Sequence, residues 1–265
     1  MDIRRGVAAG VPYAAIGSGP PVLVSAGLWP TTGVGSEAMV SGAIGPLKTL
    51  AGERTLVVVN RRGGMPADLG MRGIAAEYAE LIREEFGGRA DVLGTSTGGS
   101  IVQQLAVDHP DAVRRLVLIS TACRLGPETK HYQAQTGRLL RRGRTRAAMG
   151  VAIMEFMPRG LGPLGRATGW ITARRLVPDD DAAADLATTL EAEDRFDLAR
   201  LAPPISVPTL VVGGGKDKFY DRAMFEETAA LIPGARLLIV AGKGHIAVTN
   251  SAAAQTAIAD FLRGE

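Results

Sequence analysis

Ser96 stands in a pattern that is typical of an activated serine. The stretch Gly94-Thr95-Ser96-Thr97-Gly98 matches Gly-x-Ser-x-Gly. The segment Ala90–Leu93 before it predicts a strand, and Ser100–Val107 after it predicts a helix, which is the context in which such a serine is exposed on a tight turn. Glycines two residues before and after the serine remove side chains that would collide with the neighbouring strand and helix. The motif therefore predicts a nucleophile.

A serine hydroxyl needs a base to remove its proton, and the chain has three histidines. His109 precedes Pro110 at a predicted helix end and is expected at the surface as part of a cap. His131 falls in a central segment without strands. His245 follows an apolar run in the loop Gly242–His245. Catalytic groups of open parallel sheets gather at the carboxyl ends of the strands, so the sequence favours His245 as the base.

The base needs a carboxylate that fixes its tautomer and stabilises the imidazolium. Asp217 follows the apolar run Val207–Val212 across a glycine-rich turn and is expected at the same sheet edge. Asp221 is the competing candidate, but its position predicts the N-cap of the next helix. We therefore expect Asp217 to orient His245.

Short apolar runs alternate with longer amphipathic segments, which indicates a parallel sheet flanked by helices. The first 17 residues predict a strand pair that turns at Gly10. The buried strands are expected at 22–24, 56–59, 92–93, 116–119, 210–212 and 237–240. The helices are expected at 73–86, 100–109, 221–232 and 252–262, each ending at a breaker.

The segment from Arg124 to Ala202 contains no strand-like run and has apolar residues at helical spacing. We interpret it as a helical cap over residues 124–202, inserted into a core formed by residues 1–123 and 203–265. Five arginines lie between Arg138 and Arg146, and eight acidic residues lie between Asp179 and Asp197. Two solvated helix faces that pair with each other explain this pattern, and an arginine that binds an anionic substrate is the alternative.

Composition excludes several classes of function. The 265 residues carry a formal charge of only +3, and no basic motif with interleaved aromatics suggests nucleic-acid binding. No apolar stretch reaches the length of a signal peptide or a membrane span, so we expect a cytoplasmic protein that does not bind membranes. The single cysteine, Cys123, is expected in the core. We expect no metal and no cofactor, a small-molecule substrate as partner, and leave a homo-oligomer open.

The order Ser96, Asp217, His245 and the 28-residue step between the last two resemble the α/β-hydrolase superfamily over nearly the whole chain. This resemblance implies an α/β-hydrolase fold, with a mostly parallel central sheet flanked by helices. It also implies a helical cap inserted after the strand that follows the nucleophile helix, which here is Arg115–Ser120.

The resemblance further implies an oxyanion hole formed by the backbone N–H groups of Leu28 and Thr97. Many relatives have a His-Gly pair in the first loop, whereas this chain has Ser25-Ala26-Gly27-Leu28. A backbone donor does not depend on its side chain, so the role survives the loss of histidine. The segment 59–64 also lacks the acid that relatives often have before an Arg-Gly pair, and Asn60 can still cap that loop.

These features predict a serine hydrolase that cleaves a small or medium apolar ester or a lactone through an acyl-enzyme on Ser96. Trp29, Met154 and Met157 are expected to line the substrate pocket. Serine argues against the haloalkane dehalogenases and epoxide hydrolases of this fold. A cofactor-free haloperoxidase or perhydrolase, a thioesterase, a carbon–carbon bond hydrolase and a ligand-binding receptor with slow turnover remain open.

Overall fold

In the part of the chain that the structure describes, the central sheet has eight strands in the order β1-β2-β4-β3-β5-β6-β7-β8. The computed structural model describes residues 3–158, 160–177 and 179–264. The strands are β1 (Ile3–Ala8), β2 (Val11–Ile16), β3 (Pro21–Ser25), β4 (Thr55–Val59), β5 (Ala90–Thr95), β6 (Val113–Ile119), β7 (Thr209–Gly214) and β8 (Arg236–Val240). The predicted strand pair at the N-terminus and all six predicted core strands are confirmed.

β1 and β2 run antiparallel, and β3 to β8 are mutually parallel. The carboxyl ends of β5, β7 and β8 therefore lie at one edge of the sheet, which is where the predicted site residues follow. Strands β3 to β7 are buried along most of their length, as their apolar runs predict. The expectation that residues 237–240 are fully buried is wrong, because β8 is the edge strand and Leu237 is 37% exposed.

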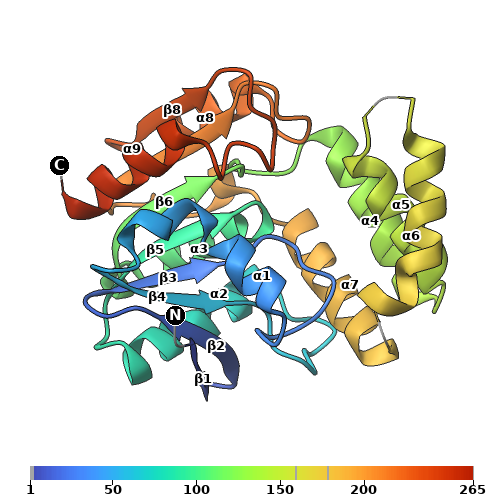
Figure 1. Cartoon of the computed structure of the whole chain (residues 1–265), viewed down its shortest axis with the longest axis horizontal. Helices are drawn as coiled ribbons and strands as arrows, with labels where there is room; N and C mark the ends of the chain where they lie inside the picture. The colour runs from blue at the N-terminus through green and yellow to red at the C-terminus, as the bar shows by residue number, and fades with distance from the viewer. Residues whose placement is uncertain (1–2, 159, 178, 265) are drawn as a thin grey trace.

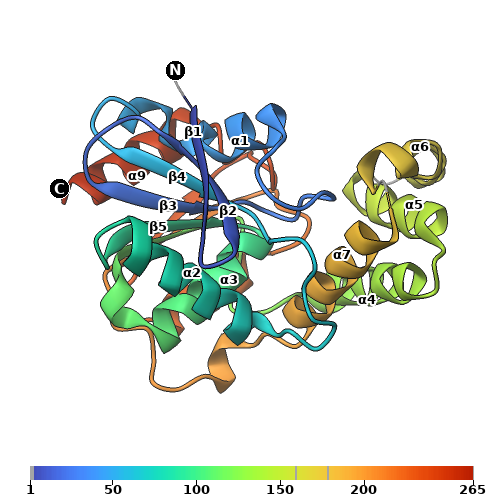
Figure 2. The same ribbon diagram turned by 90° about the horizontal axis from the view of Figure 1, so that it is seen from below.

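Helices cover both faces of the sheet, so each face packs into its own hydrophobic core (Figure 2). One face is covered by α2 (Met71–Glu85), α3 (Thr97–Asp108) and α8 (Arg222–Leu231). The other is covered by α1 (Glu37–Ala43) and α9 (Ala252–Arg263). The four predicted helices are confirmed, and α3 begins three residues earlier than expected, directly after Ser96.

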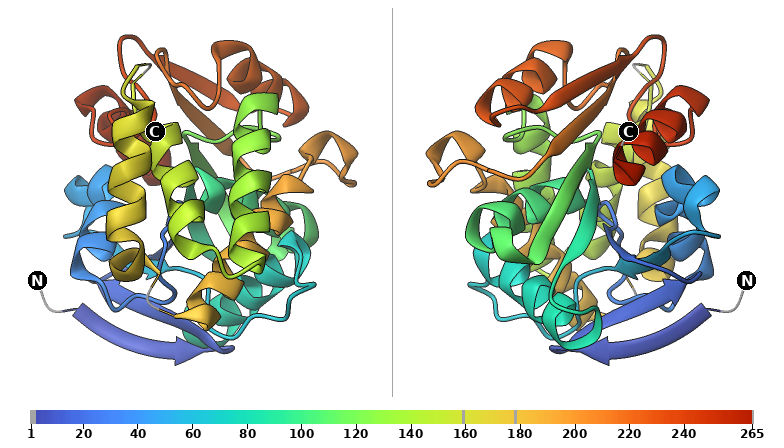
Figure 3. Two further views of the ribbon diagram at one scale, coloured as in Figure 1. Left: turned by 90° about the vertical axis from the view of Figure 1, so that its right-hand side faces the viewer. Right: turned by 90° about the vertical axis from the view of Figure 1, so that its left-hand side faces the viewer.

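Within the described residues, the segment between β6 and β7 folds into four α-helices that stand beside the carboxyl edge of the sheet (Figure 1). They are α4 (Pro127–Arg141), α5 (Thr145–Phe156), α6 (Gly162–Leu176) and α7 (Asp180–Asp194). In Figure 3, left, these green to yellow and orange helices lie in front of the sheet. They share a hydrophobic cluster of their own, which includes Leu140, Met149 and Leu186. The predicted helical insertion is confirmed.

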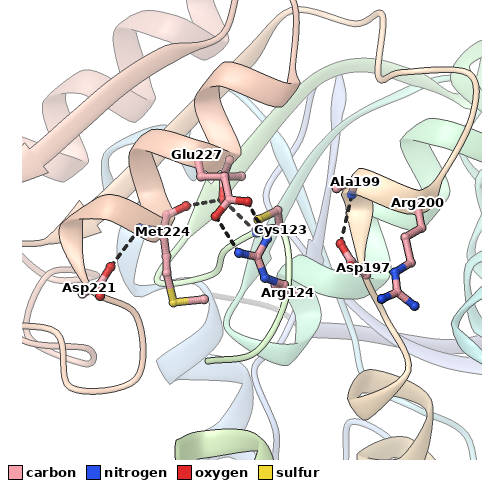
Figure 4. Close-up of polar contacts among 9 residues, drawn as sticks. Cys123, Arg124, Asp197, Ala199, Arg200, Asp221, Met224 and Glu227 are labelled. Atoms are coloured by element: carbon pink, nitrogen blue, oxygen red, sulfur yellow. Dashed lines mark hydrogen bonds and ion pairs between the residues drawn. The ribbon is translucent and has the colours of Figure 1, made fainter. Parts of the chain in front are cut away.

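The two ends of the insertion meet where it leaves the core (Figure 4). Arg124 forms an isolated antiparallel bridge with Asp197, and the Leu198 N–H donates to the carbonyl of Cys123 at 2.8 Å. The Arg124 guanidinium also donates to Glu227 of α8 at 2.8 Å. Cys123 is buried, as predicted.

The basic and acidic stretches of the insertion contact each other, as the pairing interpretation predicts. Arg141 of α4 donates from Nε and Nη2 to the two carboxylate oxygens of Glu191 on α7, at 2.9 and 2.8 Å. Within residues 3–158, 160–177 and 179–264, no helix is both long enough and apolar enough to cross a membrane.

Candidate active site

Ser96 lies at the sharp turn between β5 and α3, and its backbone has φ 52° and ψ −125°. Residues other than glycine rarely adopt such backbone angles. They cost roughly 1–3 kcal/mol and persist only where the surrounding structure enforces them. The Ser96 N–H donates to the carbonyl of Ile119 at 3.0 Å, and the Gly99 N–H donates to the Ser96 carbonyl at 2.7 Å. The turn therefore holds the Ser96 hydroxyl above the end of the sheet.

The glycines around Ser96 allow this turn to pack against its neighbours, as the motif predicts. A Cβ atom on Gly94 would lie 2.4 Å from Val102, and one on Gly98 would lie 2.3 Å from the carbonyl oxygen of Ser25. Such distances are far below van der Waals contact, so neither position accepts a side chain without displacing the backbone.

Ser96, His245 and Asp217 form a continuous line of hydrogen bonds, although 149 residues separate the first two. His245 Nε2 lies 3.0 Å from Ser96 Oγ, and His245 Nδ1 lies 2.9 Å from Asp217 Oδ2. The other oxygen of Asp217 accepts the N–H groups of Phe219 and Tyr220, at 2.9 and 3.3 Å. The Asp217 side chain is completely buried, so its orientation towards the imidazole is fixed.

The other candidates lie away from this line. His109 is the C-cap of α3 and lies 3.5 Å from Arg83, while His131 packs edge-on against Tyr132 in α4. Asp221 caps α8 by accepting the N–H of Met224 at 2.9 Å, as predicted. The structure thus brings together the favoured three residues and separates the alternatives from them.

Ser120 supports the His245 loop, and sequence reasoning missed it. Its hydroxyl donates to the carbonyl of His245 at 2.7 Å, and its backbone has φ 49°. Its N–H donates to the carbonyl of Val212 in β7. Nothing in the sequence around Ser120 signals this role, because the two residues are 125 positions apart and meet only through the order of the strands.

Leu28 and Thr97 both line the cavity that contains Ser96. Among the described residues, no acceptor is bonded to the backbone N–H of either one, so both donors are available to a ligand. A Cβ atom on Gly27 would lie 3.3 Å from the carbonyl of Thr95, so the loop that contains Leu28 packs closely against the turn at Ser96.

Two residues after β4 hold the Leu28 loop, where relatives of this fold often have an acid. The Asn60 side-chain amide donates to the carbonyls of Thr31 and Gly33, at 2.8 and 3.1 Å. Arg61 donates to the carbonyls of Trp29 and Pro30, at 2.6 and 2.8 Å. Burial lowers the pKa of Arg61 to about 10. We expected Asn60 to cap its own loop at 59–64, but its side chain bonds to the neighbouring Leu28 loop instead.

A cavity of about 350 Å³ lies between the core and the cap and contains Ser96 and His245. Its wall is mostly apolar and comprises Leu28, Trp29, Pro30, Leu125, Met149, Ala152, Ile153, Phe156, Leu176, Leu186, Leu190, Phe219, Tyr220 and Ile246, with Thr97, Thr129, Gln133, Thr136, Glu155 and Glu193 as its polar members. Of the predicted pocket residues, Trp29 is part of this wall. Met154 and Met157 line a neighbouring cavity instead, because Met154 lies on a different face of α5 from Met149 and Ile153, and Met157 follows the end of that helix.

Two acidic residues of this wall were not predicted from the sequence. Burial raises the pKa of Glu155 to about 7, with the charges of Glu128 and Glu193 adding to the shift, while Thr129 and Lys218 oppose it. Burial also raises the pKa of Glu193. Glu155 lies in an apolar helical segment and Glu193 in an acidic one, and neither pattern signals that the side chain faces a cavity. Within the described ranges, no cluster of three or more His, Cys, Asp or Glu residues could hold a metal ion.

Comparisons with known proteins agree with this architecture. The model of the alpha/beta hydrolase family matches residues 17–259. The chain is 31% identical over 195 residues to a pimeloyl-[acyl-carrier protein] methyl ester esterase of Neisseria meningitidis, covering 71% of this chain and 75% of that protein. It is 35% identical over 193 residues to the polyketide synthase ThaQ of Burkholderia thailandensis, covering 66% of this chain but only 8% of that protein.

The fold is also similar to that of solved structures. The enol-lactonase from Burkholderia xenovorans LB400 superposes with a TM-score of 0.75 and 23% identity, over 98% of this chain and 100% of that one. The family match covers most of the sequence, and the similarity in fold covers nearly all of it. The chain therefore belongs to the α/β-hydrolase family and is a hydrolase.

Proposed function

We propose that this protein is a serine hydrolase that cleaves a small or medium apolar carboxylic ester or a lactone through an acyl-enzyme on Ser96. The observation that supports this proposal best is the line of contacts from Ser96 Oγ to His245 Nε2 at 3.0 Å and from His245 Nδ1 to Asp217 Oδ2 at 2.9 Å. This geometry lets one imidazole accept a proton from the serine while the carboxylate fixes its tautomer.

In the first half of the reaction, His245 Nε2 takes the Ser96 proton as Oγ attacks the carbonyl carbon. The oxyanion accepts hydrogen bonds from the N–H groups of Leu28 and Thr97. His245 then gives its proton to the leaving alcohol oxygen as the C–O bond breaks. In the second half, a water molecule loses a proton to His245 and attacks the acyl carbon. His245 then returns that proton to Ser96 Oγ as the acyl C–O bond breaks, which releases the acid and restores Ser96.

The cavity supports an apolar and uncharged acyl group. Its wall is mostly aliphatic and aromatic, and within the described residues no lysine or arginine contributes to it. A carboxylate on the substrate would lose its hydration there without gaining a cationic partner. The volume of about 350 Å³ lies at the lower end of the roughly 300–1,000 Å³ range of ligand sites, which favours short or medium chains.

The test combines labelling with turnover. Wild-type protein should react with a fluorophosphonate probe at Ser96 and hydrolyse p-nitrophenyl butyrate, and intact mass should show a phosphonyl adduct that is absent in Ser96→Ala. Ser96→Ala should lose at least about 1000-fold in kcat, because removal of a triad member leaves only binding and the oxyanion hole. Wild-type turnover by Ser96→Ala would refute the assignment.

A panel of esters, lactones and thioesters of matched acyl length identifies the scissile bond. Higher kcat/KM on thioesters would favour the thioesterase alternative, and peroxide-dependent formation of peracid would favour the perhydrolase. Cleavage of a carbon–carbon bond in a diketone substrate would favour the carbon–carbon bond hydrolase. Stoichiometric labelling without turnover of any substrate would favour a ligand-binding receptor.

A further inference from the structure

Glu193 brings a carboxyl group from the cap to the first residue of α3. It lies in the last turn of α7 and is 1% exposed. Its Oε2 accepts the hydroxyl of Thr97 at 2.8 Å and the side-chain amide of Gln133 at 2.9 Å, and its Oε1 accepts the hydroxyl of Ser100 at 3.1 Å. One side chain thus connects α7, α4 and the helix that begins directly after Ser96.

A carboxyl group at this depth is costly unless its oxygens are hydrogen-bonded, and here both are. Burial raises the pKa of Glu193, and the hydrogen bonds from Thr97, Gln133 and Ser100 oppose that shift. The hydroxyls of Thr97 and Ser100 can rotate between donating and accepting, so these contacts persist in either protonation state.

The position of Glu193 is fixed by the core as well as by the cap. Eight residues earlier on α7, Asp185 accepts the N–H groups of Gly64 and Met65, at 3.0 and 2.8 Å. Asp185 is 3% exposed, so this second attachment is also buried. Because α7 is attached to the core at two points, it forms a fixed wall above α3, and Glu193 stays in contact with Thr97.

We propose that Glu193 is a positioning residue that fixes the Thr97 hydroxyl and thereby directs the Thr97 N–H at the substrate oxyanion. The inference rests on the proposed function of Ser96. The Thr97 side chain turns about its Cα–Cβ bond, and the same Cα is bonded to the N–H that acts as donor. The hydrogen bond from the Thr97 hydroxyl to Glu193 therefore restrains Thr97 and keeps its N–H aligned. Glu193 acts through Thr97 and does not exchange a proton with the substrate.

The test compares substitutions of the same size. Thr97→Val keeps the shape of Thr97 and removes its hydroxyl, whereas Thr97→Ser keeps the hydroxyl. Thr97→Val and Glu193→Ala should each lower kcat on p-nitrophenyl butyrate by about 10- to 100-fold, less than the 100- to 1000-fold loss of an entire donor, with KM changed less than about 3-fold. Thr97→Ser and Glu193→Gln should recover most of the lost rate.

Ser100→Ala is the matched control, because Ser100 also contacts Glu193 but provides no donor to the oxyanion. It should stay within about 3-fold of wild type, since its lost hydrogen bond affects only stability. The Thr97→Val, Glu193→Ala double variant should be no slower than the worse single variant, because both remove one contact. All rates are expressed per site that reacts with fluorophosphonate.

Three results would overturn the inference: full kcat in Thr97→Val, equal losses in Ser100→Ala and Thr97→Val, or additive losses in the double variant. If Glu193→Ala does not fold, the comparison of Thr97→Val with Thr97→Ser still decides the question. Failure of the proposed function would be seen differently, because wild-type protein itself would then show neither labelling nor turnover.

Discussion

Arg61 offers a sharp test of how the oxyanion loop is held. Its guanidinium, buried beneath the loop, donates to the carbonyls of Trp29 and Pro30 at 2.6 and 2.8 Å. Each hydrogen bond that involves a charged group contributes about 1.5–3 kcal/mol, so Arg61→Met removes roughly 3–6 kcal/mol of hydrogen bonding to the loop. These two bonds position Trp29, the residue after Leu28. A displacement of about 1 Å at a positioned group costs on the order of 100-fold in rate. We therefore expect kcat/KM to fall by about 10- to 100-fold.

Arg62 provides the control from the neighbouring position. It forms a partly buried ion pair with Glu77 at 2.9 Å and donates to the carbonyls of Gly63 and Gly64, at 3.3 and 3.0 Å, rather than to the Leu28 loop. Arg62→Met should therefore keep kcat/KM within about 3-fold of wild type. Hydrolysis of p-nitrophenyl butyrate is measured per labelled site, and urea unfolding reports stability. Equal kcat/KM in Arg61→Met and Arg62→Met would refute the reasoning, and Arg61→Lys, which keeps the charge without the planar fork, replaces Arg61→Met if that variant does not fold.

Two further outcomes follow from the site. Gly98→Ala should lower stability by about 1–3 kcal/mol, or roughly 3–10 °C in Tm, because its Cβ would lie 2.3 Å from the Ser25 carbonyl. Gly35→Ala, whose Cβ meets nothing within 4 Å, should change Tm by less than about 1 °C, and equal Tm values would contradict the steric explanation. Because the pKa of Glu155 is about 7, its carboxyl becomes charged as pH rises through 7. The kcat/KM ratio of an ester with a quaternary ammonium on its acyl chain to its isosteric tert-butyl ester should then rise about 10-fold between roughly pH 6 and 8, since the quaternary charge does not titrate and any pH dependence common to both substrates cancels. Glu155→Gln should make that ratio independent of pH, and an unchanged slope would assign it to another group.

The helices of the cap differ in how directly they contact the core. Its last helix, α7, contacts the core through Asp185 and Glu193, whereas α5 and α6 pack mainly on each other and form the outermost layer in Figures 1 and 2. The wall contributed by α5 includes Met149, Ile153 and Glu155. Substitutions there are therefore expected to change substrate range with less effect on the Ser96 geometry than substitutions on α7.

Much of the fold and the line of catalytic candidates could be predicted from the sequence, because they depend on local patterns. Apolar runs of strand length determined the core strands, and glycine and proline determined where helices end. The turn at Ser96 needs glycines at fixed neighbouring positions for steric reasons, so Gly94 and Gly98 identify it without a structure. Only three histidines exist, and His245 alone follows a strand at the edge where Ser96 is expected.

The tertiary structure alone decided the contacts between residues that no local sequence pattern connects. Ser120 meets the His245 loop, and Glu193 meets Thr97, across 125 and 96 positions of chain. The same holds for the cavity wall. Helical spacing indicated that methionines of the insertion are buried in an apolar environment, but only the packing of α5 decided that Met149 lines the cavity with Ser96 and Met154 does not. Local sequence fixes the conformation and periodicity of an element, whereas the direction in which its faces point depends on the elements packed against it.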